Sequence, residues 1–133
     1  MRFIEPGETM LGKERPFHLR SKIWIEDDSG AMVFGLGRYR ILDAVDRLGS
    51  LQAAARELKM SYRAVWCRVH LSEERLGKPL VARDGKGSRI TGYARNLMKQ
   101  FRRLQAIVET ESDDVYDTLV ADSIEPEREP ENR

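Results

Sequence analysis

Residues 37–91 read GRYRILDAVDRLGSLQAAARELKMSYRAVWCRVHLSEERLGKPLVARDGKGSRIT, and this stretch decides the fold. In its first part, apolar residues recur at three- and four-residue spacing, and Gly49 follows the last of them. Such spacing is typical of an amphipathic helix, and a glycine at that place favours a left-handed helix end. We therefore predict a helix that stops at Gly49. Its apolar positions are Ile41, Leu42, Val45 and Leu48.

Two serines are predicted to begin two further helices. Ser50 and Ser61 each precede a short apolar pattern, and a serine there accepts a hydrogen bond from a free amide of the first turn. Small residues of the second helix, such as Ala54, allow another helix to approach closely, whereas Val65 and Val69 give the third helix its inner side. Two capped helices joined by about three to four residues indicate a helix-turn-helix.

The outer side of the third helix is the predicted contact surface for duplex DNA. Because each helical residue turns by about 100°, burial of Val65 and Val69 directs Arg63 outward from the first turn, where a recognition helix touches base edges. The aromatic pair Tyr62 and Trp66 is more typical of packing beside a helix crossing than of base contact. The candidate DNA-binding residues of the helices are Ser50, Ser61, Tyr62, Arg63, Trp66, Cys67, Arg68 and His70.

A basic hairpin is predicted after the third helix. Residues 84–88 read DGKGS, and glycines in such a segment favour a tight turn between two strands. Directly after three helices, this hairpin is expected to be a wing that reaches phosphates or a minor groove; a solvated charged turn is the alternative. The candidate DNA-binding residues of the wing are Arg83, Lys86 and Arg89.

The chain from about Ile23 to Ile107 resembles the N-terminal DNA-binding domain of molybdate-responsive regulators of the ModE type, which are related to LysR-type winged helices. The matching words are GSLQAAARELKMSYRAVW, PLVARDGKG and RITGYARNL. The resemblance implies a strand pair before the first helix, a recognition helix opened by Ser61, Tyr62 and Arg63, and a long final helix that pairs two subunits. It also implies DNA contacts in the wing, from Arg83, Lys86 and Arg89.

The chain departs from that family in two respects. Its wing is shortened to DGKGS, so wing contacts do not transfer position by position. Full regulators continue into small β-barrel modules that bind molybdate, whereas only about 20 acidic and polar residues follow the predicted domain here. We therefore expect no molybdate binding.

Charge is distributed unevenly along the chain, although the formal total is +1. Residues 36–103 hold 16 Lys and Arg against six Asp and Glu, a net charge of +10. Residues 104–133 hold two arginines against ten acids, a net charge of −8, and residues 1–35 carry five bases against six acids. A basic segment that coincides with the helix-turn-helix is typical of a polyanion-binding protein.

The flanking segments complete the predicted organisation. Residues 1–16 are expected to be a flexible arm, residues 17–111 the winged helix-turn-helix domain, and residues 112–133 an acidic tail. Alternating residues predict a β-hairpin from about His18 to Phe34. An apolar stripe with heptad spacing predicts a helix over about 91–110 that covers its own domain and pairs two copies. The predicted dimer residues are Ile90, Ala94, Leu97, Phe101, Leu104 and Val108, and the later apolar residues Val115, Leu119, Val120 and Ile124 could extend this contact.

Other function classes find little support. Phosphate-loop, zinc-triad and nucleophile-elbow motifs are absent from the sequence, so we expect neither catalysis nor a cofactor. Cys67 is the only cysteine, which excludes an internal disulfide, and no apolar run approaches membrane-spanning length.

The predicted fold is therefore mostly α with small β: a winged helix-turn-helix with an N-terminal β-hairpin and a long C-terminal dimerisation helix. The predicted function is sequence-specific binding of double-stranded DNA by a cytoplasmic, homodimeric transcriptional regulator. The alternative is a helical adaptor that keeps this fold and binds a protein partner instead.

Overall fold

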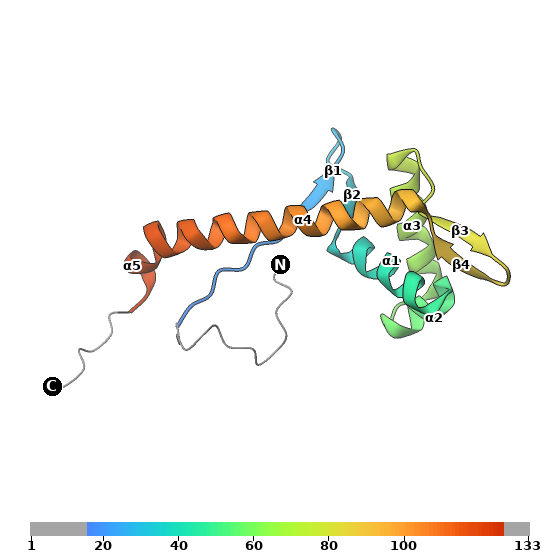
Figure 1. Cartoon of the computed structure of the whole chain (residues 1–133), viewed down its shortest axis with the longest axis horizontal. Coiled ribbons are helices and arrows are strands. Elements are labelled where there is room, and N and C mark those ends of the chain that lie inside the picture. Colours follow the sequence, from blue (N-terminus) through green and yellow to red (C-terminus); the bar gives the residue numbers. More distant parts are fainter. Residues whose placement is uncertain (1–15, 127–133) are drawn as a thin grey trace. The chain divides into compact units, whose positions relative to one another are not determined.

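A computed structural model describes residues 16–126, so the predicted arm lies almost entirely outside the described residues. The described chain divides into two compact units, one formed by Ile23–Arg102 and the other by residues 16–22 together with residues 103–126. In chain order the elements are β1 (Trp24–Glu26), β2 (Met32–Gly35), α1 (Leu36–Leu48), α2 (Leu51–Glu57), α3 (Tyr62–Leu76), β3 (Val81–Asp84), β4 (Gly87–Ile90), α4 (Gly92–Val115), the π-helical turn η1 (Tyr116–Val120) and α5 (Ala121–Ile124) (Figure 1).

Helices α1, α2 and α3 form the core of the first unit, and most predicted inward-facing residues are buried there. Ile41, Leu42 and Val45 of α1 are buried against the other helices, as are Val65 and Val69 of α3. These side chains are removed from water on one face of each helix, which is the main stabilisation available to an amphipathic helix. The predicted inward position of Leu48 was wrong, because Leu48 lies in the last turn of α1 and is 42% exposed.

The predicted helix ends are confirmed. The Oγ of Ser50 accepts a hydrogen bond from the amide of Ala53 at 3.0 Å, and the Oγ of Ser61 accepts one from Ala64 at 3.0 Å. Gly49 ends α1 with a φ of 82°, a left-handed conformation that glycine adopts without a Cβ penalty. Local sequence signals therefore fix where α1 stops and where α2 and α3 begin.

The N-terminal hairpin is shorter than predicted. Its strands cover only Trp24–Glu26 and Met32–Gly35, with Ile25 opposite Phe34 and an irregular register at the next position. β2 buries Val33 and Phe34, whereas all three residues of β1 are exposed. The alternation in residues 18–22 does not produce a strand.

Helix α4 is longer than predicted. It runs to Val115 instead of ending near Thr110, and η1 and α5 continue the helical chain to Ile124. Within the second unit, the side-chain amide of buried Gln105 donates to the carbonyl of Ser21 at 3.1 Å and to Glu109 Oε1 at 3.0 Å. A buried amide must find such partners, so Gln105 fastens the extended segment to the helix.

Candidate nucleic-acid interface

The outer side of α3 carries the residues that the sequence placed there. Val65 and Val69 are buried on the inner side, while Tyr62, Arg63 and Trp66 are exposed. Because Ser61 caps the helix, the amino-terminal turn of α3 begins directly at Tyr62 and Arg63. The structure thus gives α3 an exposed first turn with an arginine and an aromatic residue. Cys67, half-buried, and His70, exposed, follow on later turns.

Trp66 is held by a neighbour on the same helix. Its ring stacks on the His70 imidazole with a centroid separation of 3.8 Å and an interplanar angle of 20°. The Nδ1 of His70 lies 2.9 Å from the Trp66 carbonyl oxygen, an acceptor, so Nδ1 carries the proton in this arrangement. The Nε2 of His70 then lies 3.7 Å from Glu73 Oε1. These contacts fix the indole in one orientation on the surface.

Arg68 lies on a different side of α3 from Arg63. Its guanidinium approaches the Met60 sulfur at 3.6 Å, and it acts electrostatically on Arg38 of α1. The Nε of Arg38 donates to the Oγ of fully buried Ser72 at 3.3 Å. Burial lowers the pKa of Arg38 first, and the positive charges of Arg68 and Arg75 lower it further. Arg68 is exposed on that other side of α3, and its contact with DNA stays a prediction.

Arg38 and Arg75 join Arg68 in a basic flank that the sequence analysis missed. Arg68, Ser72 and Arg75 recur at spacings of four and three residues along α3, which places them on one side of that helix. This spacing was a readable signal, but nothing in the sequence indicates that Arg38 of α1 comes to the same place. The flank concentrates positive charge on a side of α3 that differs from the side that carries Arg63.

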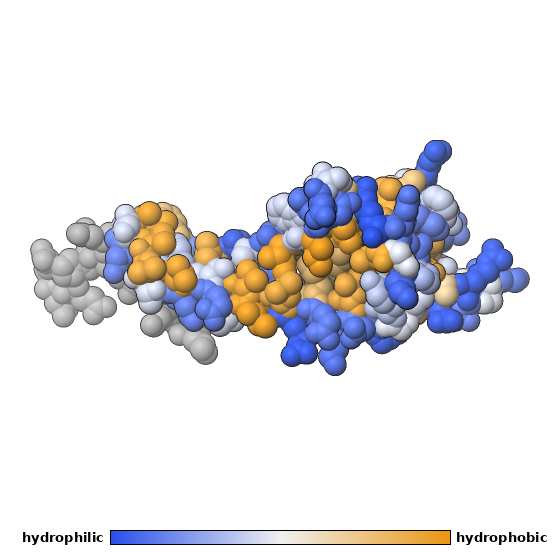
Figure 2. Space-filling view, turned by 90° about the horizontal axis from the view of Figure 1, so that it is seen from above, coloured by the Kyte–Doolittle hydropathy of each residue, from blue (hydrophilic) through white to orange (hydrophobic). Residues whose placement is uncertain are grey.

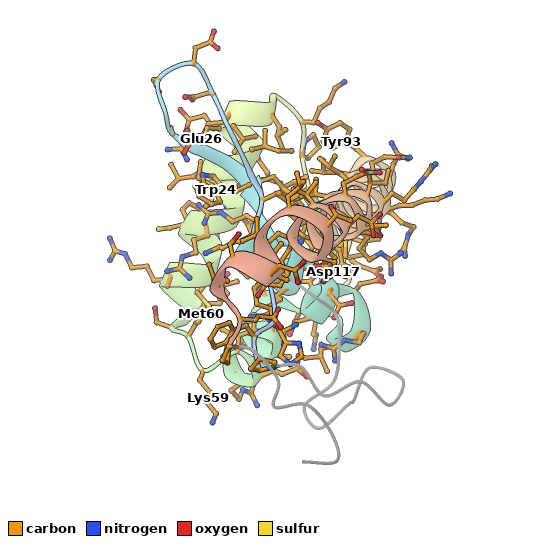
Figure 3. The ribbon with its side chains drawn as sticks, turned by 90° about the vertical axis from the view of Figure 1, so that its left-hand side faces the viewer. Trp24, Glu26, Lys59, Met60, Tyr93 and Asp117 are labelled. Atoms are coloured by element: carbon orange, nitrogen blue, oxygen red, sulfur yellow. The ribbon has the colours of Figure 1, made fainter. Side chains whose placement is uncertain are left out.

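The turn between α2 and α3 contains a non-glycine residue in a left-handed conformation. Lys59 has a φ of 56°, and its amide donates to the Arg56 carbonyl at 3.2 Å. The next amide, that of Met60, donates to Ala55 at 2.9 Å. Lys59 extends into solvent from this turn, with Met60 beside it (Figure 3).

The two hydroxyls predicted to contact DNA, those of Ser50 and Ser61, accept cap hydrogen bonds and each retain a proton to donate.

The predicted wing is present as the hairpin β3–β4, which projects from the helices of its unit (Figure 1). Arg83 pairs with Ser88 and Ala82 pairs with Arg89, so the two wing arginines lie on opposite faces of the ribbon. Lys86 lies in the turn, after Gly85 with its φ of 60°. The structure therefore does not bring the three basic wing residues together on one surface.

The reading helix and the base of the wing share one carboxylate. Glu73 of α3 accepts hydrogen bonds through Oε2 from the amides of Leu80 at 2.7 Å and Val81 at 3.2 Å. Leu80 is fully buried, and its carbonyl accepts from the Thr91 amide at 2.9 Å, where the ribbon ends. Glu73 thus ties the start of β3 to the same helix that carries Arg63.

The structure corrects the predicted dimer seam at three positions. Ile90, Ala94 and Phe101 are buried within the chain's own first unit, so their side chains are not available to a partner. The Phe101 ring meets Phe34 edge to face at 5.3 Å and lies 6.2 Å from the Tyr39 ring. Of the remaining seam residues, Leu97 and Val108 are half-buried and Leu104 is 46% exposed.

Two kinds of site are not found in the part of the chain that the structure describes. Over residues 16–126, no group of three or more His, Cys, Asp or Glu side chains is arranged to hold a metal ion. Across the same residues, no helix has both the length and the apolar character needed to cross a membrane.

Comparison with known proteins identifies the helical core. Residues 36–95 match the sequence model of the family described as "Bacterial regulatory helix-turn-helix protein, lysR family". The chain is 33% identical over 73 residues to the molybdenum transport protein ModE of Azotobacter vinelandii, covering 51% of this chain and 27% of that protein. It is also 33% identical over 82 residues to the molybdenum-pterin-binding protein MopA of Rhodobacter capsulatus, covering 58% of this chain and 31% of the relative. The chain thus spans less than a third of the length of either relative.

Solved structures share the fold. The chain superposes on the DNA-binding domain of CbnR, solved in complex with DNA, with a TM-score of 0.52 and 21% identity, covering 63% of this chain and 97% of that one. The DNA-binding domain of BenM, solved with benA site 1 DNA, gives a TM-score of 0.51 and 20% identity over 63% of this chain and 98% of that one. The matched sequence family is one of regulatory proteins, not of enzymes. Residues 36–95 therefore resemble the helix-turn-helix of the bacterial regulatory lysR family, and the chain is similar in sequence to ModE-type proteins.

Proposed function

We propose that this chain is a transcriptional regulator that binds double-stranded DNA by placing the outer face of α3 in a major groove. The observation that carries the proposal is the exposed first turn of a capped third helix, with Arg63 at the position from which a recognition helix reaches base edges. A planar guanidinium there can donate two hydrogen bonds to guanine O6 and N7.

The charge of the domain supports a polyanionic ligand. The net charge of +10 over residues 36–103 falls on the segment that holds the helix-turn-helix and the wing. Lysine and arginine that neutralise phosphates release counterions, which gives binding energy without reading sequence. Lys86 at the tip of the wing and Lys59 beside α3 are suited to this role because both are exposed. The DNA-binding domains of CbnR and BenM were solved in complex with DNA, which supports the same class of ligand.

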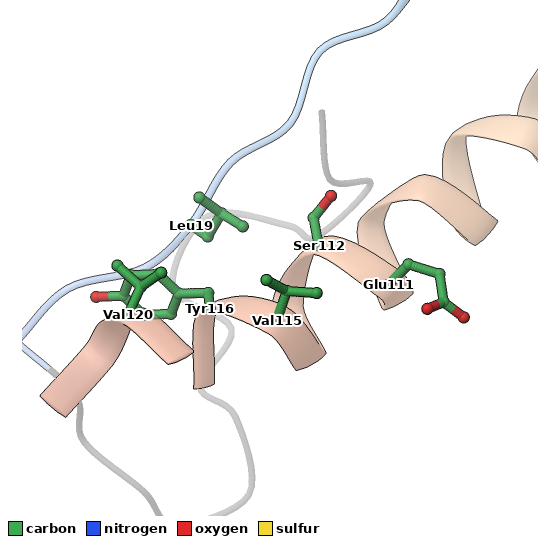
Figure 4. Close-up of a pocket in the computed structure, with 6 residues that line it drawn as sticks. All are labelled: Leu19, Glu111, Ser112, Val115, Tyr116 and Val120. Carbon is green, nitrogen blue, oxygen red and sulfur yellow. The ribbon is translucent and has the colours of Figure 1, made fainter. Parts of the chain in front are cut away.

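We propose that the active form is a homodimer, since paired recognition helices match the symmetry of a two-part operator. In the second unit, apolar side chains stay exposed over the C-terminal helical segment, where Figure 2 shows hydrophobic surface gathered at the α5 end. Val115 and Val120 also line a shallow pocket with Leu19 and Tyr116 (Figure 4). A second copy that covers this surface would remove it from water. The exposed members are Leu104, Ile107, Val115, Leu119, Val120 and Ile124.

Selection of bound fragments from genomic DNA, followed by fluorescence anisotropy, tests the DNA function. Arg63→Ala should weaken binding to the selected site by about 1–3 kcal/mol and reduce discrimination against random duplex. Lys99→Ala is the matched control, because it removes one exposed positive charge from α4 and leaves α3 unchanged. An equal loss of affinity for both variants would mean that Arg63 contributes only its positive charge. Absence of duplex binding by the unaltered protein would favour a protein-binding adaptor.

Sedimentation tests the dimer separately. Ile107→Glu places a charge on an exposed apolar position and should separate the subunits, because burying an unpaired charge costs several kcal/mol. Gln100→Glu, an exposed polar position on the same helix, is the control and should leave association unchanged. A dimer that survives Ile107→Glu would place the contact elsewhere.

A further inference from the structure

The wing makes a backbone contact with the turn that joins α1 to α2. The Ser88 amide of β4 donates a hydrogen bond to the Gly49 carbonyl at 2.8 Å. Gly49 is also the left-handed residue that ends α1, and the next residue, Ser50, caps α2. One peptide carbonyl at the entrance to the helix-turn-helix therefore holds the second strand of the wing.

Gly87, the residue before Ser88, lies too close to this carbonyl to carry a side chain. A Cβ added to Gly87 would stand 2.2 Å from the Gly49 oxygen and 3.4 Å from the Gly49 carbonyl carbon. The first distance is well below van der Waals contact, and the atom it meets belongs to the backbone, which cannot swing away as the end of a long side chain can. Glycine at position 87 is thus what lets the ribbon approach the turn.

The neighbouring glycines differ in this respect. Gly85 occupies the tip of the wing with a φ of 60°, and an added Cβ there would meet open space. Gly92 at the start of α4 also has open space around it. Gly85 allows the backbone conformation of the turn, whereas Gly87 allows β4 to lie close to the turn between α1 and α2.

We propose that Gly87 is the positioning residue of the wing: it lets β4 dock on the Gly49 carbonyl and so fixes where Lys86 and Arg89 stand relative to α3. This inference rests on the proposed DNA function. The base of the ribbon is held independently by Glu73, so loss of the Gly49 contact leaves β3–β4 attached at Leu80 but free to pivot there. The wing would remain folded but would no longer have a fixed orientation relative to α3.

Gly87→Ala, measured against Gly92→Ala, tests the proposal in the full chain. The methyl group should push β4 from Gly49 and lower affinity for selected and random duplex alike, by roughly tenfold at low salt, because phosphate contacts of the wing are lost. The slope of affinity against salt should fall by about one unit. Gly92→Ala should bind as the unaltered protein does. Equal affinity and equal salt slope for Gly87→Ala would overturn the proposal.

A double-mutant cycle shows whether the effect passes through the wing. In a background that carries Lys86→Ala and Arg89→Ala, adding Gly87→Ala should change affinity by less than about twofold, because the charges that it displaces are already gone. A full tenfold loss in that background would mean that the methyl group disturbs the helices instead, and would reject the positioning role. If the unaltered protein itself shows no salt-dependent duplex binding, the DNA function fails first; if it binds and Gly87→Ala binds equally, only the positioning role fails.

Hydrogen exchange provides a test that does not depend on how well a variant folds. In the unaltered protein, the Ser88 amide should exchange at least tenfold more slowly than the Lys86 amide at the tip, because only the former has a backbone acceptor outside the ribbon. Exchange of Ser88 as fast as that of Lys86 would show that the Gly49 contact does not persist in solution, and would reject the proposal.

Discussion

The first unit contains two antiparallel hairpins that the fold uses in opposite ways. The hairpin β1–β2 buries its second strand: Phe34 and Val33 enter the core, and Phe34 meets Phe101 edge to face. The wing β3–β4 buries only Ile90, at its base, and presents basic side chains along the rest of the ribbon.

The difference between these hairpins supports the proposal that β1–β2 stabilises the core and that the wing contacts DNA. The turn of β1–β2 carries Asp27 and Asp28, which a DNA backbone would repel, whereas the turn of the wing carries Lys86. Asp27 instead organises its own turn, accepting hydrogen bonds through Oδ1 from the Ser29 amide at 2.9 Å, the Ser29 hydroxyl at 2.6 Å and the Ala31 amide at 3.0 Å. Burial and tip charge, more than strand content, distinguish the two roles.

The largest expected effect is a loss of stability when the buried strand β2 is altered. Phe34→Ala should lower the free energy of unfolding by about 3–5 kcal/mol, because it removes a fully buried ring that packs on Phe101. Ile25→Ala, opposite Phe34 in register but 39% exposed, should change it by less than about 1 kcal/mol. Urea denaturation measures both. Similar losses for the two variants would mean that both strands of β1–β2 contribute to the core.

An intermediate effect, on binding alone, is expected at the wing tip. Lys86→Ala should weaken all duplex sequences alike, by roughly threefold at low salt, and should reduce the salt slope by about one unit. The free energy of unfolding should stay unchanged because Lys86 is exposed. Asp28→Ala also changes one charge at a hairpin tip and should leave DNA affinity unchanged. Tighter binding by Asp28→Ala would bring the acidic hairpin close to DNA and would break the comparison.

The smallest expected effect is on the dependence of stability on pH in the acidic range. Hydrogen bonds from the Ser29 hydroxyl and then from Ala31 hold the pKa of Asp27 below its ordinary value, so the folded state favours the carboxylate. Stability from this group is present above the unfolded pKa, near pH 4, and is lost as pH falls through the lower folded pKa. Melting temperatures between about pH 2 and pH 6 should therefore fall less steeply for Asp27→Asn than for the unaltered protein. Parallel curves would show that Asp27 contributes no acid sensitivity.

The parts of the fold that depend on neighbours in sequence could be predicted. Caps at Ser50 and Ser61, the left-handed Gly49 and the glycine turn of the wing all rest on contacts within a few residues. The buried side of α3 also followed from spacing, because helical geometry alone sets which residues share a face. The reading face was predicted at Arg63 for the same reason.

The parts that depend on distant partners could not be predicted. The stripe on α4 shows that Phe101 needs cover, but its spacing does not indicate whether a second copy or Phe34 of the same chain supplies it. Arg68 was assigned by its charge, and only the folded chain brings Arg38 beside it. The role of Gly87 is equally invisible in sequence, since the Gly49 carbonyl that excludes a side chain comes from another element.

The hydrogen bonds that Glu73 accepts affect the entropy of ligand binding. A loop that becomes ordered only on contact with a ligand loses conformational entropy at that moment, and the loss reduces affinity. Because Glu73 fixes the first two amides of the ribbon to α3, that entropy is lost when the domain folds, before any ligand binds. Glu73→Gln, with a weaker acceptor for the same two amides, should give duplex association a more unfavourable entropy in calorimetry, even if the contacts in the complex are the same.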